Sequence, residues 1–300
     1  MVAVDLGAAR TSYEAEGQWT SPMLFTPAEI TRFLDATERV VGGHHRSGRA
    51  PMLCLPFEPG PHDLRKIDNA WWADPDLAAL ATDARLGEIA AALLGASSVR
   101  LWQDQLLYKP PGGPSETTIG WHQDWASWDT VASHAAFVTA WVAFDDVDDE
   151  NGAMQVIPGS QTWGLVPGAS NFFGTDRDAQ LARLDASRAA RAQDYPAARA
   201  QDYSPAARAR DSRAVESRSI VMRAGQVSFH HPLTFHGSGP NTSDRMRRSL
   251  AIHFVDAEVS AVSEPGGIWQ HYNLALFLER GGLLGERYRF DDLCPTVFAQ

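Results

Sequence analysis

The chain has 300 residues, of which 44% are hydrophobic, and its ten tryptophans suit a large packed interior. A formal net charge of -11 argues against a nucleic-acid or membrane-surface partner, because both favour basic faces. Cys54 and Cys294 are too few for a disulfide framework, residues 1–10 lack a secretory signal pattern, and no stretch approaches the roughly 20 apolar residues of a membrane span. We therefore expect a cytoplasmic protein.

The first hundred residues predict helices. Residues 1–20 are polar and unpatterned, and we expect a loosely held lead-in. Thr26 is followed by proline and, three residues on, by glutamate, which is typical of a helix start and predicts a helix over 27–40. A second helix is predicted over 76–94, where apolar residues recur at helical spacing until Gly95. These helices are expected to cover one side of a sheet.

From residue 99 onward the pattern becomes that of strands. They are predicted over 99–108, 136–145, 153–157, 219–222, 226–230 and 248–256. The acidic stretch 145–152 is expected to be a solvated hairpin turn, because it lacks the spaced oxygen ligands of a calcium-binding loop. Many strands with Gly/Pro turns after N-terminal helices predict a mainly β protein with flanking helices, built on a double-stranded β-helix (a cupin-like jelly roll).

We expect one domain over residues 1–300, with a helical N-terminal part (1–98), a barrel core (99–256) and a C-terminal extension (257–300). Residues 168–218 interrupt the core, are rich in arginine and contain Arg-Ala-Gln-Asp-Tyr twice. Such an insertion is either a tolerated surface loop or an active-site cover. In the second interpretation it is a lid, and its arginines attract an anionic substrate group.

A possible metal site begins with His122 and Asp124. Side chains two residues apart on a strand share a face, so both could reach one ion, with His236 as a distant third ligand. Two imidazoles and one carboxylate form the facial triad of non-haem Fe(II) oxygenases. The triplet alone is weak, and His236 could instead be a buried hydrogen-bonded histidine, since His230 and His231 lie just before it. These two are expected to be strand residues or to support the ligands.

Two further motifs strengthen the metal-site interpretation. His236 is followed by Gly-Ser-Gly-Pro-Asn, and Arg247 lies eleven residues beyond it. With these motifs, spread over about residues 66–254, the chain resembles the phytanoyl-CoA dioxygenase-like family of Fe(II)/2-oxoglutarate enzymes. The resemblance implies Fe(II) bound by His122, Asp124 and His236, and an oxidation that uses O2 and 2-oxoglutarate and releases succinate and CO2. Related iron halogenases replace the carboxylate with a small residue, so its presence argues for oxygen transfer.

Arg247 is the expected partner of 2-oxoglutarate, because a guanidinium can give a carboxylate two parallel hydrogen bonds. On a strand it would share a face with alternate residues as far as His253. Arg245 and Arg248 are the rival arginines, and as surface residues they need no function.

The resemblance implies five further residues at the cosubstrate site. They are Lys66, Gln105, Gln123, Trp141 and Ser238. Trp141 could instead be a core aromatic, Lys66 a surface residue and Ser238 a turn former. The chain departs from the family at Gln105, where the phytanoyl enzyme has methionine, and at Gln161, where histidine is common.

The expected substrate is a small molecule, more specifically a secondary metabolite, because nothing marks a CoA site and the net acidity does not favour a polyanion. Hydroxylation, desaturation, epoxidation, epimerisation and ring closure all remain open. Five aromatic residues could wall the pocket, although barrel aromatics are more often core: Trp125, Trp128, Trp163, Phe172 and Phe173. The alternative from another class is a non-oxidative cupin-like barrel, an isomerase or binding protein, which would give Arg247 no task. The oligomeric state is not predicted.

Overall fold

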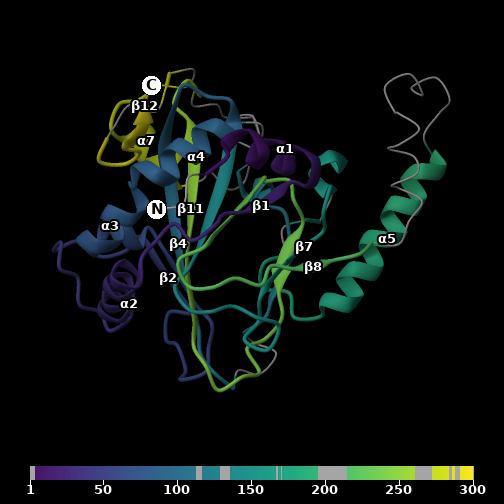
Figure 1. Cartoon of the computed structure of the whole chain (residues 1–300), viewed down its shortest axis with the longest axis horizontal. Helices are drawn as coiled ribbons and strands as arrows, with labels where there is room; N and C mark the ends of the chain where they lie inside the picture. Colours follow the sequence, from purple (N-terminus) through teal and green to yellow (C-terminus); the bar gives the residue numbers. More distant parts are fainter. Residues whose placement is uncertain are drawn as a thin grey trace.

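Two antiparallel sheets enclose the interior of the protein (Figure 1). The computed structural model describes residues 4–112, 117–128, 136–166, 168–169, 171–194, 215–260, 272–283, 286–287 and 291–299. The large sheet has the order β1-β9-β6-β11-β4-β3-β2, and β12 also pairs with β4. Its strands are β1 (Gln18–Thr20), β2 (Leu53–Leu55), β3 (Arg65–Asp68), β4 (Ser98–Lys109), β6 (Phe137–Ala143), β9 (Val227–His230), β11 (Arg247–Asp256) and β12 (Thr296–Ala299).

The small sheet has the order β5-β10-β7-β8. Its strands are β5 (Ile119–His122), β10 (His236–Ser238), β7 (Met154–Val156) and β8 (Arg218–Ser219). Trp141 and Ala251 of the large sheet pack in one buried cluster with Ile119, Met154 and Val156 of the small sheet. The core between the sheets is therefore formed by both of them.

Each long strand of the large sheet divides its side chains between two faces. On β11, Leu250, Ile252 and Phe254 belong to a buried cluster that includes residues of the N-terminal helices. Ala251 and His253 lie on the opposite face and line an interior cavity. This alternation follows from the period of two in a strand. The predicted sharing of a face between Arg247 and His253 is confirmed, since Arg247 lines the same cavity.

The N-terminal helices cover the outer face of the large sheet (Figure 1). They are α1 (Leu6–Glu16), α2 (Pro27–Val41), α3 (Pro75–Ala81) and α4 (Ala84–Leu94). Helix α2 begins as predicted, with Thr26 as its cap and a reciprocal hydrogen bond to Glu29. The single helix predicted over 76–94 is wrong. Thr82 ends α3, and the Asp83 side chain then accepts the Arg85 N–H and begins α4.

The expected loose lead-in over residues 1–20 is also wrong. Residues 6–16 form α1, whose Ala9 and Tyr13 are buried, and β1 pairs with β9. The sequence lacks an obvious apolar stripe here because the helix buries few residues. The N-terminal part is also less purely helical than predicted, since β1, β2 and β3 extend the large sheet.

The acidic stretch 145–152 is not a hairpin turn. It carries the chain from β6 in the large sheet to β7 in the small one, so the two strands it joins do not pair. The Asp145 carboxylate accepts two hydrogen bonds from the Arg248 guanidinium and one from its backbone N–H, and Asn151 is fully buried. The strand predicted over 219–222 is reduced to β8 and a single bridge between Met222 and Val147.

The long insertion contains helix α5 (Arg177–Asp194), which extends away from the two sheets (Figure 1). Its first turns are attached to the small sheet, because Gln180 accepts the N–H of Trp121 on β5. Asn171 and Phe172, just before α5, line cavities inside the protein. Residues 195–214, which include most of the sequence duplication, lie outside the described residues, so the lid stays a prediction.

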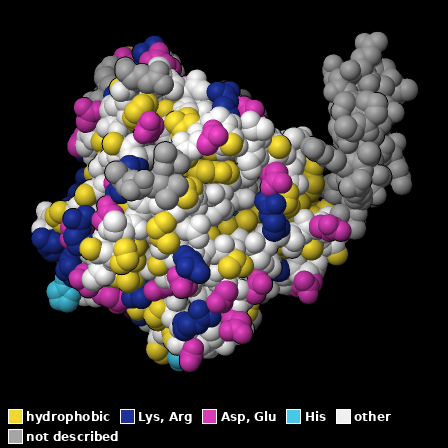
Figure 2. Space-filling view, viewed as in Figure 1, with side chains coloured by type: hydrophobic (Ala, Val, Ile, Leu, Met, Phe, Trp, Pro, Cys, Tyr) yellow, Lys and Arg dark blue, Asp and Glu magenta, His cyan; other side chains and the backbone are white. Residues whose placement is uncertain are grey.

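A C-terminal helix and short 3-10 helices complete the part of the chain that the structure describes. Helix α7 is Tyr272–Glu279, and the short 3-10 helices formed by described residues are η1 (Ala70–Trp72), η3 (Asp124–Ser127) and η5 (Ser160–Trp163). Among the described residues, no helix is both long and apolar enough to cross a membrane. On the face seen in Figure 2, acidic and basic side chains are interspersed.

Candidate metal centre

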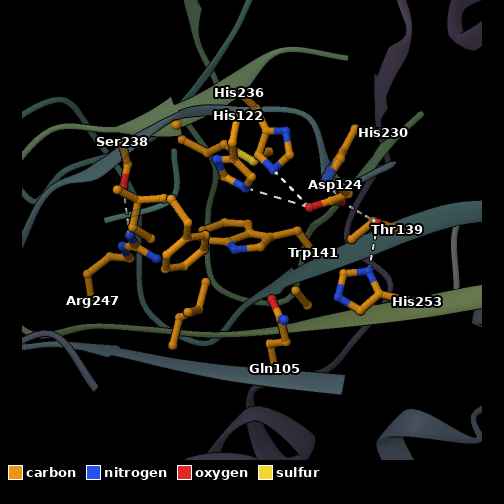
Figure 3. A pocket seen from close by; sticks show the side chains of 16 residues that line it. Gln105, His122, Asp124, Thr139, Trp141, His230, His236, Ser238, Arg247 and His253 are labelled. Atoms are coloured by element: carbon orange, nitrogen blue, oxygen red, sulfur yellow. Dashed lines mark hydrogen bonds and ion pairs between the residues drawn. The ribbon is translucent and has the colours of Figure 1, made fainter. Parts of the chain in front are cut away.

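His122, Asp124 and His236 meet between the two sheets (Figure 3). All three are buried, and one ligand atom from each lies within 4.8 Å of the other two. His122 and His236 are direct partners across the β5–β10 ladder. The prediction that His122 and Asp124 share a strand is only half right, because β5 ends at His122 and Asp124 begins η3. The turn of η3 nevertheless brings the carboxylate back toward both imidazoles.

Backbone carbonyls orient the two imidazoles. His122 Nδ1 lies 2.8 Å from the carbonyl oxygen of Gly120, and His236 Nδ1 lies 2.9 Å from that of Thr234. Each Nδ1 therefore carries hydrogen and donates it to the carbonyl, which leaves the Nε2 lone pair for a metal ion. Both Nε2 atoms lie 3.6 Å from Oδ1 of Asp124. Two nitrogens and one oxygen thus converge on one point.

The second carboxylate oxygen of Asp124 is held from the other side. Its Oδ2 accepts a hydrogen bond from Thr139 Oγ1 at 3.0 Å and lies 3.3 Å from His230 Nε2. Burial raises the pKa of Asp124, but His236 and the hydrogen bonds of His122 and His230 outweigh it and hold the pKa well below its ordinary value. Burial lowers the pKa of His236 well below its ordinary value. An ionised carboxylate beside the neutral imidazole of His236 is a state that binds a divalent cation.

One cavity, called here the inner cavity, extends from this triad toward Arg247 (Figure 3). Its empty volume is about 420 Å³, and its walls include the triad, Gln105, Thr139, Trp141, Phe172, His230, Ser238, Arg247 and His253. Large-sheet strands supply Gln105, Trp141 and Arg247, whereas the small sheet supplies Ser238. The metal triad and the arginine thus face one shared space.

Arg247 is 1% exposed. Its Nη1 donates to Ser249 Oγ at 3.1 Å, its Nη2 lies 3.4 Å from Ser238 Oγ, and its guanidinium carbon lies 5.3 Å from the ring centre of Trp141. Burial lowers the pKa of Arg247 to about 10, so it remains a cation at neutral pH. Its Nε has no hydrogen-bond partner among the described residues. A buried cation with an unused donor is suited to an anionic ligand.

The two rival arginines are engaged elsewhere. Arg245 pairs with Asp148 at 2.6 Å on the surface. Arg248 pairs with Asp145 and Glu38, both at 2.7 Å, on the opposite face of β11. Of the three candidates only Arg247 lines the inner cavity.

A second space, called here the outer cavity, adjoins the triad at His122 and Asp124. Its empty volume is about 990 Å³, and its other described walls are Lys66, Asp68, Gln103, Gln105, Gln123, Ser127, Trp128, Asn171, Phe172 and Phe173. Lys66 and Asp68 form an ion pair along one wall. The outer cavity therefore combines aromatic rings, amides and a neutralised charge pair.

The profile of the phytanoyl-CoA dioxygenase (PhyH) family matches residues 13–249. The chain belongs to this family. The family suggested by the sequence motifs is thereby confirmed.

Curated relatives of this PhyH-family chain are about one quarter identical to it. A probable alpha-ketoglutarate-dependent hypophosphite dioxygenase of Stutzerimonas stutzeri is 27% identical over 195 residues, which are 65% of this chain and 58% of the relative. The peroxisomal phytanoyl-CoA dioxygenase of Bos taurus is 24% identical over 265 residues, 86% of this chain and 70% of the relative. Ectoine dioxygenase of Streptomyces avermitilis is 26% identical over 257 residues, 84% and 79% of the two chains. The chain spans just over half of the hypophosphite enzyme's length.

Solved structures confirm the predicted fold class. The carbocyclase SnoK from nogalamycin biosynthesis superposes with a TM-score of 0.67 at 24% identity, covering 96% of this chain and 95% of that one. The epimerase SnoN from the same biosynthesis gives 0.64 at 20% identity, covering 97% and 98%. EctD from S. alaskensis, with 2-oxoglutarate and 5-hydroxyectoine, gives 0.61 at 19% identity, covering 86% and 78%. The core of two sheets, with helices on its outside, is the jelly-roll fold of these dioxygenase-like structures.

The structure distributes the five cosubstrate residues implied by the family resemblance between the two cavities. Trp141 and Ser238 line the inner cavity, and Gln105 lines both. Lys66 lines only the outer cavity and is paired with Asp68.

Gln123 also borders the outer cavity, but backbone groups occupy its amide. Its Nε2 donates to the carbonyls of Gly164 and Leu233, and its Oε1 accepts the N–H of Val166. Gln123 thus holds the backbone of the neighbouring loops in place around the triad, and its amide does not point toward a ligand.

The expected aromatic wall is only partly formed. Trp128, Phe172 and Phe173 line the outer cavity. Trp125 packs against other aromatic rings of the core, and Trp163 packs near Phe235. Gln161, the second departure from the family, donates to the carbonyl of Glu14 in α1 and lines neither cavity.

Sequence reasoning missed Lys109 and Thr139 and gave no role to His253. Thr139 connects Asp124 to His253, whose Nδ1 lies 2.8 Å from Thr139 Oγ1. Lys109 lies directly behind Ser238 and donates to its Oγ at 2.7 Å. For Lys109 a signal existed, because Lys66 and Lys109 are the only lysines among 26 lysine and arginine residues. The sequence carries no signal for Thr139, because its contacts depend on which strands are neighbours in the sheet.

Proposed function

We propose that the protein is an Fe(II)- and 2-oxoglutarate-dependent dioxygenase that oxidises a small molecule. One observation carries the proposal: a buried His122–Asp124–His236 triad shares the inner cavity with Arg247, which has no carboxylate partner among the described residues. A metal triad alone would suit many barrels. A buried arginine facing it across one cavity is what a chelating 2-oxo dicarboxylate requires.

The residues present fit the proposed metal. Two imidazole nitrogens and one carboxylate oxygen are the donor set of non-haem Fe(II) oxygenases, and three protein ligands leave positions for other molecules. When bound, the iron supplies the activation of O2 and the oxidation, coupled to decarboxylation of 2-oxoglutarate. The chain itself holds the ion with His122, Asp124 and His236.

The cosubstrate would occupy the inner cavity. Arg247 would bind its distal carboxylate, Ser238 would add a hydrogen bond, and Trp141 would form an apolar wall between this end and the triad. The buried position of Arg247 favours this role, because a charge-assisted hydrogen bond is stronger where water is excluded.

The substrate would occupy the outer cavity, which reaches His122 and Asp124 from another side. Trp128 and Phe172 suit the flat faces of a ring compound, and Gln103 and Gln105 can exchange hydrogen bonds with its polar groups. A secondary metabolite is consistent with these walls and with the nogalamycin biosynthesis named for SnoN and SnoK. A cytoplasmic location, suggested by the two unpaired cysteines, belongs to the same proposal.

The first test needs no substrate. Fe(II) and then 2-oxoglutarate are added without oxygen to metal-free protein, and visible absorption is followed. We expect a charge-transfer band that requires both additions and disappears in His236→Ala, because the chelate forms only on a bound ion. Iron binding without a band would favour the non-oxidative cupin-like alternative, and no iron binding would reduce the resemblance to the fold.

The second test separates the arginines. Arg247→Gln should raise the 2-oxoglutarate concentration needed for half of the band by about 10- to 100-fold, because a charge-assisted bond pair contributes roughly 1.5–3 kcal/mol. The matched control is Arg245→Gln, whose guanidinium pairs with Asp148 on the surface and should leave the titration unchanged. Equal effects in the two variants would contradict the assignment of Arg247.

A further inference from the structure

Two basic residues lie side by side in the interior. Lys109 and Arg247 are direct partners across the β4–β11 ladder. Lys109 is 0% exposed and Arg247 is 1% exposed. Like charges directly opposite each other destabilise a sheet, and burial increases the repulsion. A fold that keeps such a pair needs a compensating interaction.

No described carboxylate supplies that interaction. Among the residues that the structure describes, neither Lys109 nor Arg247 has an acidic group within the 4.0 Å of an ion pair. By contrast, Lys66 pairs with Asp68 and Arg248 pairs with Asp145. The Lys109–Arg247 pair is therefore arranged for an anion from outside the chain.

Lys109 does not line the inner cavity but lies directly behind one of its walls. Its Nζ donates to Ser238 Oγ at 2.7 Å and to the carbonyl of Gly239 at 2.6 Å. Arg247 Nη2 approaches the same Ser238 oxygen at 3.4 Å. A serine hydroxyl has two lone pairs and one hydrogen, and here both lone pairs face basic donors. Its hydrogen is left to be donated, and Ser238 lines the inner cavity.

The Lys109 ammonium lies in closely packed surroundings. A Cβ added at Gly152 would lie 3.1 Å from Lys109 Nζ and 2.7 Å from the carbonyl oxygen of Gly239. An ammonium is compact, whereas a guanidinium is a wide planar fork. In a chain that otherwise uses arginine almost throughout, a lysine at this point is consistent with a requirement for a compact buried donor.

We propose that Lys109 is a positioning residue of the 2-oxoglutarate site, which fixes Ser238 so that its hydroxyl donates to the distal carboxylate bound by Arg247. The inference rests on the proposed function, because it assigns no other ligand to this cavity. Lys109 acts through Ser238, without touching the cosubstrate.

The electrostatics agree with this role. Burial, together with the charges of Arg247 and Arg177, holds the pKa of Lys109 well below its ordinary value. A carboxylate bound beside Arg247 would offset this repulsion. The free protein thus keeps two opposed basic side chains whose repulsion ligand binding relieves, which is how a preorganised anion site gains affinity.

The test compares two ligands that chelate a metal alike but differ at the far end. Protein loaded with Ni(II), which is stable in air, is titrated calorimetrically with 2-oxoglutarate and with oxalate, which has no distal carboxylate. Lys109→Met should raise the Kd for 2-oxoglutarate by about 10- to 100-fold, since the affected bonds involve charged groups. The Kd for oxalate should change by less than about threefold, within the scatter expected of an uninvolved site.

A double-mutant cycle tests whether Lys109 acts through Ser238. In a Ser238→Ala background, Lys109→Met should weaken 2-oxoglutarate binding by much less than in the wild-type background, because coupled residues are not additive. Equal losses for both ligands, or fully additive losses, would mean that Lys109 serves only the fold. If Lys109→Met does not fold, Lys109→Gln replaces it. Its amide can still donate to Ser238, so a smaller loss of 2-oxoglutarate affinity with unchanged oxalate binding is expected, and equal losses for both ligands would overturn the role.

The two proposals fail in different ways. If wild-type protein binds Ni(II) but no 2-oxoglutarate, the proposed function itself falls and the role of Lys109 falls with it. If wild-type protein binds 2-oxoglutarate and Lys109→Met binds it equally well, only the positioning role is overturned.

Discussion

Asp124 presents its two oxygens to different neighbours. Oδ1 faces the Nε2 atoms of His122 and His236, while Oδ2 is held by Thr139 and approached by His230. Thr139 is itself fixed by His253, because burial lowers the pKa of His253 to about 3 and the neutral ring can donate from Nδ1. This chain of contacts leaves Oδ1 as the oxygen available to a metal ion.

Thr139→Val should therefore weaken metal binding without creating a cavity in the core. The valine has nearly the same shape but cannot donate to Asp124, and loss of such a supporting bond typically costs 10- to 100-fold in metal affinity. Competition with a metal chelator measures the Kd for Co(II) or Ni(II).

The matched control is Thr37→Val, since Thr37 in α2 is equally buried and its hydroxyl has no partner among the described residues. Equal metal affinity in Thr139→Val and wild-type protein would show that Asp124 needs no such support.

The proposed ligands could be predicted from the sequence, and His230 was expected as a possible support of them, whereas Thr139 was not. His122 and Asp124 are close in sequence, and the motif around His236 carries the family's pattern. Thr139 and His230 reach Asp124 only because β6 and β9 are neighbours in the large sheet. That adjacency is a property of the whole topology, to which a single sequence gives no local signal.

At the scale of elements, the start of α2 is an example of structure set by local sequence. Glu29 accepts hydrogen bonds from the backbone and the hydroxyl of Thr26, and from Arg85 of α4. Partial burial raises the pKa of Glu29, but these bonds from Arg85 and Thr26 outweigh it and lower the pKa to about 2. The carboxylate thus both caps α2 and ties it to α4.

Glu29→Gln should lower the free energy of unfolding by about 1 kcal/mol at pH 7, the usual magnitude for a helix cap. Because the folded-state pKa lies below the unfolded value of 4.5, the contribution is complete above about pH 4.5 and fades as the pH falls toward 2. Chemical denaturation at pH 7, 5, 4 and 3 should show the two proteins converging in stability.

Glu14→Gln is the control for Glu29→Gln, because the Glu14–Arg10 pair is exposed and exposed pairs contribute little. A gap between wild type and Glu29→Gln that stayed constant down to pH 3 would argue against an ionised cap.

Local signals explain which elements were predicted well. The cap of α2 and the alternating residues of β4, β6 and β11 lie within a few positions of one another. The break at Thr82 between α3 and α4 depends on an aspartate cap inside an apolar pattern. The stretch 145–152 was misread because its flanking strands look like a hairpin, although each finds its partners elsewhere. The course of the chain at 145–152 is therefore set by strand pairing with residues distant in sequence.

At the scale of the whole molecule, the proposed site joins the two sheets. His122 and His236 come from the small sheet, whereas Trp141 and Arg247 come from the large one. The sequence order of the motifs does not reveal this division, since β10 and β11 are close in the chain but belong to different sheets. A metal ion alone would engage β5, η3 and β10, and a bound dicarboxylate would reach β11 as well.

Ligand binding should consequently stabilise the protein in two separable steps. A ligand present at 100 times its Kd stabilises the folded state by about 2.7 kcal/mol. Because each kcal/mol of stabilisation raises Tm by about 2–4 °C in a large domain, each step should raise Tm by roughly 5–10 °C.

In wild-type protein, Ni(II) should give the first increment in Tm and 2-oxoglutarate the second. Arg247→Gln should keep the first and lose most of the second, whereas Asp124→Ala should lose both, because the dicarboxylate needs the ion as its other anchor. An increment from 2-oxoglutarate that survives in Arg247→Gln would mean that the ligand is held by the small sheet alone, and that the two sheets are not connected through it.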